Sequence, residues 1–496
     1  MSLTNYLGTA LVVAPVLTGL TAFLPGTTRN QGRVSLAGSA LTFVLSTAVA
    51  LQVFTAGPLA EWGNALRVDA LGAYLILLTG LLTTLAAFYT PAYLETEVRH
   101  GLVAARSLRR YYLWFHLFVG TMFWALTANN LGMMWAAVEA TTLASAFAVG
   151  FYGKPHSLEA AWKYMIICSV GLAFALLGTA VTYAAALNAP GVAEGALAWS
   201  DLVAVTGRLN PSLMKLAFGL VLVGYGTKAG LAPMHTWLPD AHSQAPSPIS
   251  ATLSGVLLAV AVQAILRFYV LVNGAVGPGF AGKLLVGFGL LSMATAVPFT
   301  AVQRDLKRLL AYSSIEHMGI VALGIGLGGP YGLFGALYHL FFHGIGKGLL
   351  FFSAGQVTQA YGTRYMSRIR GAQKVAPVAG LGLFLGTLAI TGTPPFALFL
   401  SEFSVAAAAF SSGRTWIGLL FLAIVAVIFG AFLYHVGHMV FGEPAGRVRL
   451  APPARGSTSA SVVIVVSLVA LVAGGLFVPA TVRNVVAQVG QVLGVG

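Results

Sequence analysis

Charged residues are scarce in this sequence. Only 8% of its 496 residues are Asp, Glu, Lys or Arg, whereas 58% are hydrophobic and the mean hydropathy is +0.86. Soluble domains carry roughly 25% charged residues, so a single water-soluble globule is excluded. The apolar runs are continuous and about 20 residues long rather than alternating over about ten residues. This pattern predicts membrane-spanning helices and argues against a transmembrane β-barrel.

Cysteine is almost absent as well. The one cysteine, Cys168, lies in an apolar run, and a single thiol excludes internal disulfides, cysteine-bound iron–sulfur clusters and Cys-type zinc sites. The chain also lacks a P-loop, a glycine-rich nucleotide motif after a strand and a facing pair of haem-type histidines. We therefore expect no cofactor in this chain and no direct use of ATP. The N-terminus lacks the basic region of a cleavable signal and is expected to be the first span itself.

The net charge of +14 does not indicate a nucleic-acid partner, because the basic residues stand singly or in small groups between the apolar runs. Eighteen Lys and Arg residues fall in one set of alternate connections and six in the other. The positive-inside rule therefore predicts a multi-pass protein of the cell membrane, with both termini on the non-cytoplasmic side. Lys228, Arg267 and Lys347 remain within or near apolar runs.

The sequence thus predicts an all-α polytopic membrane protein with about fourteen transmembrane helices. The expected spans are about 4–24, 34–56, 68–90, 111–128, 131–152, 162–187, 212–232, 247–273, 281–300, 308–328, 331–357, 376–408, 416–441 and 459–480. We expect residues 1–110 to hold helices 1–3, 111–273 helices 4–8, 274–441 helices 9–13, and 442–496 helix 14 and the tail. No connection is long enough for a soluble domain.

Two of these segments have a similar plan. The five spans of 111–273 include a fourth member broken at Pro233, and the five spans that follow include a fourth member broken at Thr393-Pro394-Pro395. One unit starts outside and the other inside. Two five-helix units of opposite topology, with discontinuous helices 7 and 12, form an inverted repeat, which is typical of proteins that transport ions through a site between the halves.

The first break is rich in polar residues. Lys228 lies deep in the apolar run before it, and His235, Asp240 and His242 follow it. A charged and interrupted helix is costly in hydrocarbon and is tolerated mainly inside protein or along a wet cavity. The pattern therefore favours an ion-handling broken helix over a plain loop between two spans. His235, Asp240 and His242 are candidates for proton uptake, with helix capping as the structural alternative.

Glu139 is the only charged residue of its span. An isolated carboxylate is unfavourable in a medium of low dielectric constant, so it must be protonated or paired. The structural alternative is a carboxyl group that only bonds a neighbouring helix. The functional hypothesis pairs Glu139 with Lys228, and the opening of that pair would let the lysine release a proton.

His339, His343 and Lys347 recur at i, i+4 and i+8, which places them along one face of a helix. Two histidines at this spacing can bind a metal, but no acidic residue or thiol lies near them in sequence, and we expect no metal site. A hydrated row of titratable groups suits histidine, which titrates near neutral pH. Polar packing is the alternative. His317 and Glu402 are further candidates, in or next to other spans.

Four stretches together resemble one known family: Gly226–Leu258, Arg304–Ile320, Tyr338–Gly355 and Thr391–Phe403. The chain resembles the antiporter-like membrane subunits of respiratory NADH–quinone oxidoreductase (complex I) and their relatives in membrane-bound hydrogenases and multisubunit cation/proton antiporters. Two phrases, HSQAPSPISATLSGVLL and PPFALFLSEF, are most similar to component F of hydrogenase-4 and formate-hydrogenlyase-type complexes. The resemblance covers about residues 110–410.

The resemblance implies a fourteen-helix fold with a polar axis at mid-membrane. It implies that Glu139 is the carboxylate of helix 5 and that Lys228 is its partner on helix 7. His317, His339, His343 and Lys347 would continue the axis, and Glu402 would be the terminal residue on helix 12. Members that reduce quinone usually place a lysine on helix 8 where this chain has Ala259, with Gln263 as the next polar residue. The central link of the axis is therefore expected to be missing or replaced by water, Gln263 or a histidine.

Three functions follow as hypotheses. The first is a proton-translocating membrane subunit of a hydrogenase-4-like or complex I-like oxidoreductase, with other membrane subunits and a peripheral redox arm as partners, embedded in the lipid bilayer. The second is a subunit of a secondary Na⁺/H⁺ antiporter. The third is a structural membrane anchor of a hydrogenase module, to which Ala259 lends weight.

Overall fold

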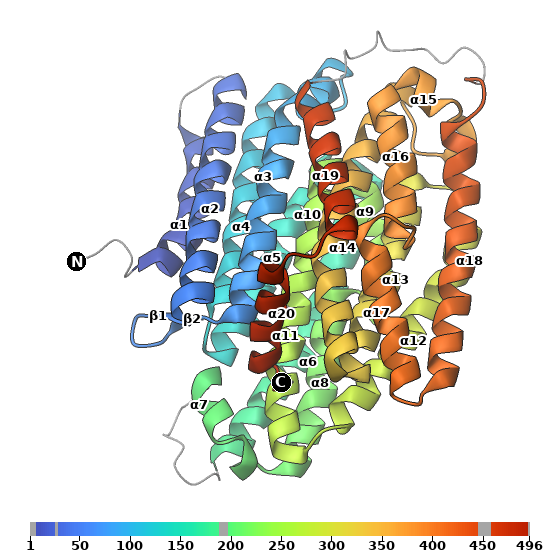
Figure 1. Cartoon of the computed structure of the whole chain (residues 1–496). Coiled ribbons are helices and arrows are strands. Elements are labelled where there is room, and N and C mark those ends of the chain that lie inside the picture. The colour runs from blue at the N-terminus through green and yellow to red at the C-terminus, as the bar shows by residue number, and fades with distance from the viewer. Residues whose placement is uncertain (1–5, 25–27, 188–196, 445–457, 495–496) are drawn as a thin grey trace.

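The computed structural model describes residues 6–24, 28–187, 197–444 and 458–494. Both chain ends, for which the sequence predicts a non-cytoplasmic location, lie outside these ranges. Within them the helices run roughly parallel or antiparallel to one another and form an elongated bundle (Figure 1). The connection with α15 (Ala372–Val375) and the connection with α7 (Trp199–Ala204) lie at opposite ends of the bundle, as expected for alternate loops.

Ten helices of the described residues are long and apolar enough to cross a membrane. Four of the fourteen predicted spans are not among these ten, for reasons visible in their sequences. The first is short, the twelfth is split in two, and 108–127 and 329–361 carry polar or basic side chains such as Arg109, His116 and Lys347. The predicted fold class is confirmed, whereas the number of spans stays a prediction.

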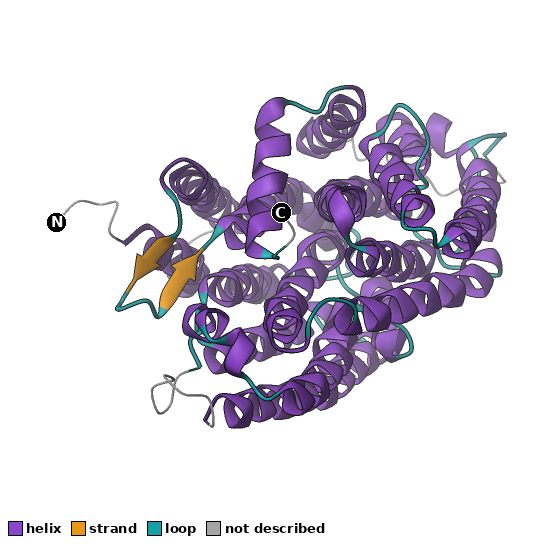
Figure 2. Cartoon of the chain, turned by 60° about the horizontal axis from the view of Figure 1, so that its bottom comes forward, coloured by secondary structure: helices purple, strands orange, loops and turns teal. Residues whose placement is uncertain are grey.

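The N-terminal part comprises α1 (Leu7–Leu20), α2 (Thr28–Ala56) and α3 (Ala70–Arg99). A small antiparallel hairpin, β1 (Leu59–Glu61) and β2 (Leu66–Val68), joins α2 to α3 at the edge of the bundle (Figure 2). The sequence did not predict it. Its Glu61 accepts hydrogen bonds from the backbone N–H groups of Gly8 (2.7 Å) and Thr9 (2.9 Å). The hairpin therefore supplies a carboxylate to the N-terminus of α1, where the backbone donors lack partners within the helix.

The first predicted unit comprises α4 (Leu108–Thr127), α5 (Leu131–Val149), α6 (Pro155–Leu187), α8 (Pro211–Ala229), α9 (Trp237–Gln244), α10 (Ser247–Thr252) and α11 (Leu258–Val276). A π-helical turn, Leu253–Leu257, joins α10 to α11. The second unit comprises α12 (Phe280–Ala301), α13 (Leu306–Leu327), α14 (Gly329–Tyr361), α16 (Pro377–Ile390), α17 (Ala397–Ser411) and α18 (Thr415–Val440). The helices α19 (Thr458–Leu476) and α20 (Ala480–Val492) follow.

The fourth helix of each unit is interrupted where the sequence predicts it. In the first unit α8 ends at Ala229 and α9 begins at Trp237. The freed backbone groups are bonded within the protein: the indole of Trp237 donates to Thr227 O (2.8 Å), and the Ala232 N–H donates to Ser292 Oγ (2.9 Å). Such bonds let an interrupted helix persist at membrane depth. In the second unit α16 ends at Ile390 and α17 begins at Ala397.

The two units meet closely at a pair of glycines. A Cβ atom added to Gly255, in the π-helical turn, would lie 2.9 Å from Gly344 O, and one added to Gly344 would lie 2.8 Å from Gly255 O. Small residues allow such close approach of helices in membranes. Tyr74 and Tyr89 of α3 donate hydrogen bonds to carbonyl groups of α14, each at 2.9 Å. These contacts fix α14 at the centre of the bundle.

Candidate functional site

Lys228 is fully buried in the last turn of α8. Its ammonium donates hydrogen bonds to Tyr164 OH of α6 (2.5 Å) and Thr142 Oγ1 of α5 (2.9 Å), and it lies 4.7 Å from the centre of the Tyr164 ring. Burying a charge is expensive unless it is paired or hydrogen-bonded. Here the partners of the ammonium are two neutral hydroxyl groups and an aromatic face.

The hydrogen-bond directions around Tyr164 follow from a count of protons. Ser145 Oγ donates to Thr141 O at 2.5 Å, so it accepts the hydrogen bond that joins it to Tyr164 OH at 2.7 Å. The Tyr164 hydroxyl therefore donates to Ser145 and keeps a lone pair for Lys228. The arrangement holds the lysine in place without a negative charge beside it.

Glu139 does not contact Lys228 directly. Its carboxylate accepts hydrogen bonds from Ser169 Oγ (2.6 Å) and, weakly, from Thr142 Oγ1 (3.5 Å), and no ion pair within 4.0 Å joins Glu139 and Lys228 in the described structure. The predicted pair is thus linked through the Thr142 hydroxyl. Glu139 is half-buried, on the outer side of this link. We name Glu139, Thr142, Tyr164 and Lys228 the lysine cluster.

A second group of buried polar residues lies in the other unit. His339 and His343 of α14 stack with ring centres 6.3 Å apart, as their i, i+4 spacing predicts, and the His317 ring of α13 lies 4.9 and 5.2 Å from them. One turn further on, Lys347 donates to Leu310 O (2.8 Å) and to Ser313 Oγ. Together with Glu316 and Glu402, these residues form what we name the histidine cluster.

The protonation of His339 is fixed by its neighbours. Ser401 Oγ donates to Leu398 O (2.7 Å), so it must accept from His339 Nδ1 at 2.9 Å. A neutral His339 therefore carries its proton on Nδ1 and presents the lone pair of Nε2 to His317 Nδ1, 2.8 Å away. The Nε2 atom of His317 is buried without a hydrogen-bond partner in the described structure.

Glu402 lies at the second break. One ligand-type atom from each of His317, His339 and Glu402 falls within 4.8 Å of the other two. The carboxylate lies over Gly392, where an added Cβ atom would be 2.0 Å from Glu402 Oε2. Glu402 follows its break, in α17, whereas Lys228 precedes its break, in α8. The two residues therefore occupy opposite halves of their interrupted helices.

The helix from α10 to α11 connects the two clusters. It packs against α8 on one side and against α14 on the other. Ser254, in its π-helical turn, shares a hydrogen bond of 2.7 Å with Ser314 of α13. Ala259 is buried just beyond this turn, so the position at which the family resemblance led us to expect a lysine is apolar here. π-helical turns occur frequently at functional sites.

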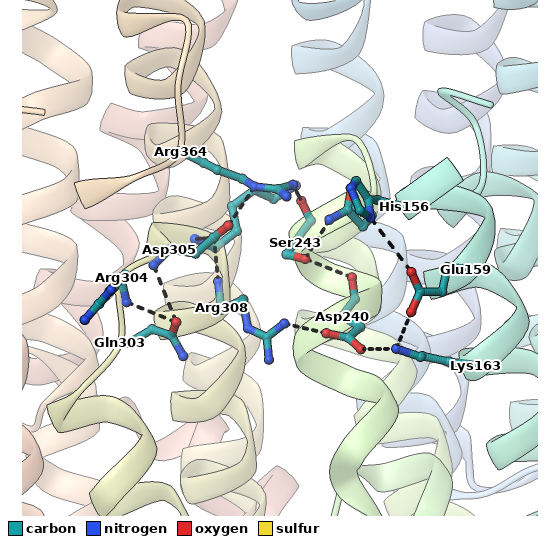
Figure 3. Close-up of polar contacts among 12 residues, drawn as sticks. His156, Glu159, Lys163, Asp240, Ser243, Gln303, Arg304, Asp305, Arg308 and Arg364 are labelled. Carbon is teal, nitrogen blue, oxygen red and sulfur yellow. Dashed lines mark hydrogen bonds and ion pairs between the residues drawn. The ribbon is translucent and has the colours of Figure 1, made fainter. Parts of the chain in front are cut away.

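Asp240, His235 and Gln263 lie apart from both clusters. Asp240 of α9 pairs with Arg308 of α13 (2.5 Å) and Lys163 of α6 (3.5 Å) (Figure 3). It lies at the side of an open cavity of about 240 Å³. It ties three helices together rather than facing Lys228. His235 lies in the break with its ring 6.5 Å from Tyr312. Gln263 of α11 is buried and donates to Leu126 O (3.3 Å).

Several residues of the clusters were not singled out from the sequence. Thr142 lies three residues after Glu139, and this i, i+3 spacing was a usable signal. Glu316 directly precedes His317 on α13 and is buried. Tyr164 and Ser401 lie in apolar or mixed segments with no local pattern that indicates their role. Only the packing of α6 on α8 and of α17 on α14 brings them to the site.

Comparisons with known proteins agree with this architecture. Residues 128–430 match the family model described as NADH:quinone oxidoreductase/Mrp antiporter, transmembrane. The chain is thus an antiporter-like membrane protein with interrupted helices, and it belongs to this family. More particularly, it is 40% identical over 384 residues to a hydrogenase-4 component F homolog from Methylacidiphilum infernorum (isolate V4), covering 77% of this chain and 80% of that protein.

Solved structures share the fold over almost the whole length of this chain. A chain of the membrane-bound sulfane sulfur reductase, an archaeal respiratory membrane complex, superposes with a TM-score of 0.86 at 21% identity, over 98% of this chain and 97% of that one. A chain of respiratory complex I from Thermus thermophilus with bound aureothin superposes with a TM-score of 0.75 at 26% identity, over 95% and 97%. The family resemblance drawn from the four sequence stretches is confirmed.

Proposed function

We propose that this chain is a proton-translocating subunit of a hydrogenase-4-like or complex I-like oxidoreductase in the plasma membrane, with both termini on the non-cytoplasmic side. One observation carries the proposal. Lys228 is buried completely between neutral hydroxyl groups, one of which links it to Glu139. An intramembrane ionisable residue is costly, so its presence favours function over packing. The lysine can hold or release a proton according to the state of its neighbours.

The histidine cluster supplies the next part of the path. His317, His339 and His343 lie in ring contact, and Lys347 follows on the same helix. Both ring nitrogens of His343 and of His242 are buried without a hydrogen-bond partner among the described residues. Buried polar atoms are nearly always bonded to protein or water, so these atoms favour a hydrated path. At the level of Ala259, the Ser254–Ser314 hydroxyl pair and water would carry the proton instead of a lysine side chain.

The energy for translocation comes from partner subunits in this proposal. Moving one charge against a potential of 100 mV costs about 2.3 kcal/mol, and the sequence has no nucleotide-binding motif to supply it. The similar solved structures are chains of respiratory membrane complexes. We therefore propose other membrane subunits and a peripheral redox arm as partners, with redox chemistry there changing the protonation of the lysine cluster.

The test is proton translocation by the intact complex in proteoliposomes, measured per substrate turnover. Lys228→Ala and Glu139→Gln should each abolish most translocation. Glu443→Gln is a suitable control, because Glu443 lies at an exposed ion pair with Lys374. Normal translocation in both cluster variants would refute the assigned roles. Loss of complex assembly, with translocation intact in whatever complex remains, would favour the role of a structural anchor.

A secondary Na⁺/H⁺ antiporter is the second candidate, because the family description includes Mrp antiporters. This function would need no redox partner. Proton flux that depends on a sodium gradient, in liposomes that contain the chain but no redox subunit, would favour it over the first proposal.

A further inference from the structure

Three potential metal ligands converge in the histidine cluster. The nearest ligand-type atoms of His317, His339 and Glu402 all lie within 4.8 Å of one another, and all three side chains are buried. They come from α13, α14 and α17. The sequence argued against a metal because no acidic residue lies near the histidines along the chain. The fold supplies that residue from the second break.

His339 Nε2 now accepts a hydrogen bond from His317 Nδ1–H at 2.8 Å. An ion that displaces this proton to the unpartnered His317 Nε2 would have both facing nitrogens as ligands. Ser401 fixes the proton of His339 on Nδ1, which leaves Nε2 as a ligand atom. His317 Nε2 has no hydrogen-bond partner, and the carboxylate of Glu402 receives no hydrogen bond from the described residues. Histidines that bind metals nearly always donate their second N–H to a neighbouring acceptor. Ser401 provides that acceptor for His339 before any ion arrives.

The ligand types and distances define the class of ion. Two imidazoles and a carboxylate suit Zn²⁺ and related divalent transition metals, whereas Mg²⁺ and Ca²⁺ prefer oxygen ligands. Metal–ligand bonds of about 2.0–2.2 Å in a tetrahedron place ligand atoms about 3.3–3.6 Å apart. The His317–His339 nitrogens, now 2.8 Å apart, would separate slightly, and the widest of the three separations would close by about 1.5 Å. Rotation of the side chains provides shifts of this size.

Of the three ligands, Glu402 is the most exposed, and it lies at the second break. Glu402 keeps 7% of its surface exposed, and its carboxylate packs on Gly392, whose lack of a side chain leaves room for it. Gly392 and Thr393 are half-buried, and Pro394 and Pro395 are exposed. The carboxylate therefore lies between the surface of the bundle and the two imidazoles.

We propose that Zn²⁺, or a divalent transition-metal ion of the same preference, binds His317, His339 and Glu402 and thereby blocks the histidine cluster. Binding occupies lone pairs that proton transfer would use and holds the rings in one orientation. The binding itself depends only on the geometry of the three ligands. The block rests on the proposed function, because it requires that protons pass through this cluster.

Binding is tested with Co²⁺, whose visible absorption reports tetrahedral nitrogen and oxygen coordination, titrated into the purified, chelator-treated complex. The wild-type complex should bind one more Co²⁺ than the Glu402→Gln complex, and Zn²⁺ should displace it. Ser401→Ala should weaken the affinity about 10- to 100-fold, the usual effect of removing a partner of a ligating histidine. His343→Gln is the matched control: this histidine lies in the same cluster outside the ligand set, so the affinity should stay within about twofold.

Equal Co²⁺ binding by the wild-type and Glu402→Gln complexes would overturn the site, as would loss of binding in His343→Gln alone. Thermal unfolding of each complex shows whether a variant is folded.

The block is tested by Zn²⁺ inhibition of proton translocation, expressed relative to each variant's own rate. Ser401→Ala should shift the inhibitory concentration by the same factor as the affinity. Tight Zn²⁺ binding without inhibition of proton translocation would refute the proposed block but not the proposed metal site. If the wild-type complex binds the metal ion and the Lys228→Ala complex translocates protons at the normal rate, the proposed function is refuted and the metal site is not.

Discussion

The Thr142 hydroxyl is the most specific point at which the proposed path can be broken. It accepts a hydrogen bond from Lys228 Nζ at 2.9 Å and faces the Glu139 carboxylate at 3.5 Å. Thr142→Val keeps the shape of the side chain but removes both contacts. Thr142→Ser keeps the hydroxyl and loses only a methyl group. The two variants therefore separate the role of the hydroxyl from that of packing.

The expected magnitude follows from the hydrogen bonds of Lys228. Its buried ammonium has two acceptors, Thr142 and Tyr164. Hydrogen bonds to charged groups contribute about 1.5–3 kcal/mol, so Thr142→Val disfavours the protonated lysine by a factor of about 10 to 150. Because the same hydroxyl is the only link to Glu139 in the described structure, we expect the rate of proton translocation to fall at least tenfold. Thr142→Ser should stay within about threefold of the wild type.

The assay is the initial rate of proton uptake by proteoliposomes, read with an entrapped pH-sensitive dye while substrate turnover is recorded in parallel. The ratio gives protons per turnover and separates loss of translocation from loss of redox activity. Thermal unfolding in detergent checks that both variants fold. A Thr142→Val complex that translocates at the wild-type rate and ratio would show that protons do not pass between Glu139 and Lys228 through this hydroxyl.

Two further predictions concern stability, measured by thermal unfolding in detergent. Asp69→Ala should lower the free energy of unfolding by about 3–5 kcal/mol, because it leaves the buried Arg267 without its carboxylate partner. Burial opposes ionisation of Asp69, but Arg267 holds the pKa of Asp69 below its ordinary value. The ion pair therefore stabilises the fold above about pH 4, and this contribution is lost as the pH falls through the native pKa. A pH-independent cost of Asp69→Ala would contradict this. Gly255→Ala should lower the free energy of unfolding by about 1–3 kcal/mol, because the added methyl group overpacks against Gly344. Gly219 has open space around it, so Gly219→Ala should change the free energy of unfolding little.

Local patterns in the sequence determined the architecture and part of the site. Continuous apolar runs predicted the spans, because a helix that crosses lipid must be apolar over about 20 residues. Prolines predicted the two interrupted helices, since a proline lacks a backbone N–H and does not sustain a regular helix. The i, i+4 spacing of His339 and His343 predicted a shared face, which their stacked rings show. Each of these features depends on the geometry of a single helix.

Only the tertiary structure decided how side chains from different helices meet. It placed the Thr142 hydroxyl between Glu139 and Lys228, and it drew Asp240 into ion pairs at an open cavity. It also brought Glu402 beside His317 and His339. The helical period fixes neighbours along one helix, but contacts between helices depend on rotation, depth and close approach, which packing sets for the bundle as a whole. A sequence read one segment at a time does not contain those variables.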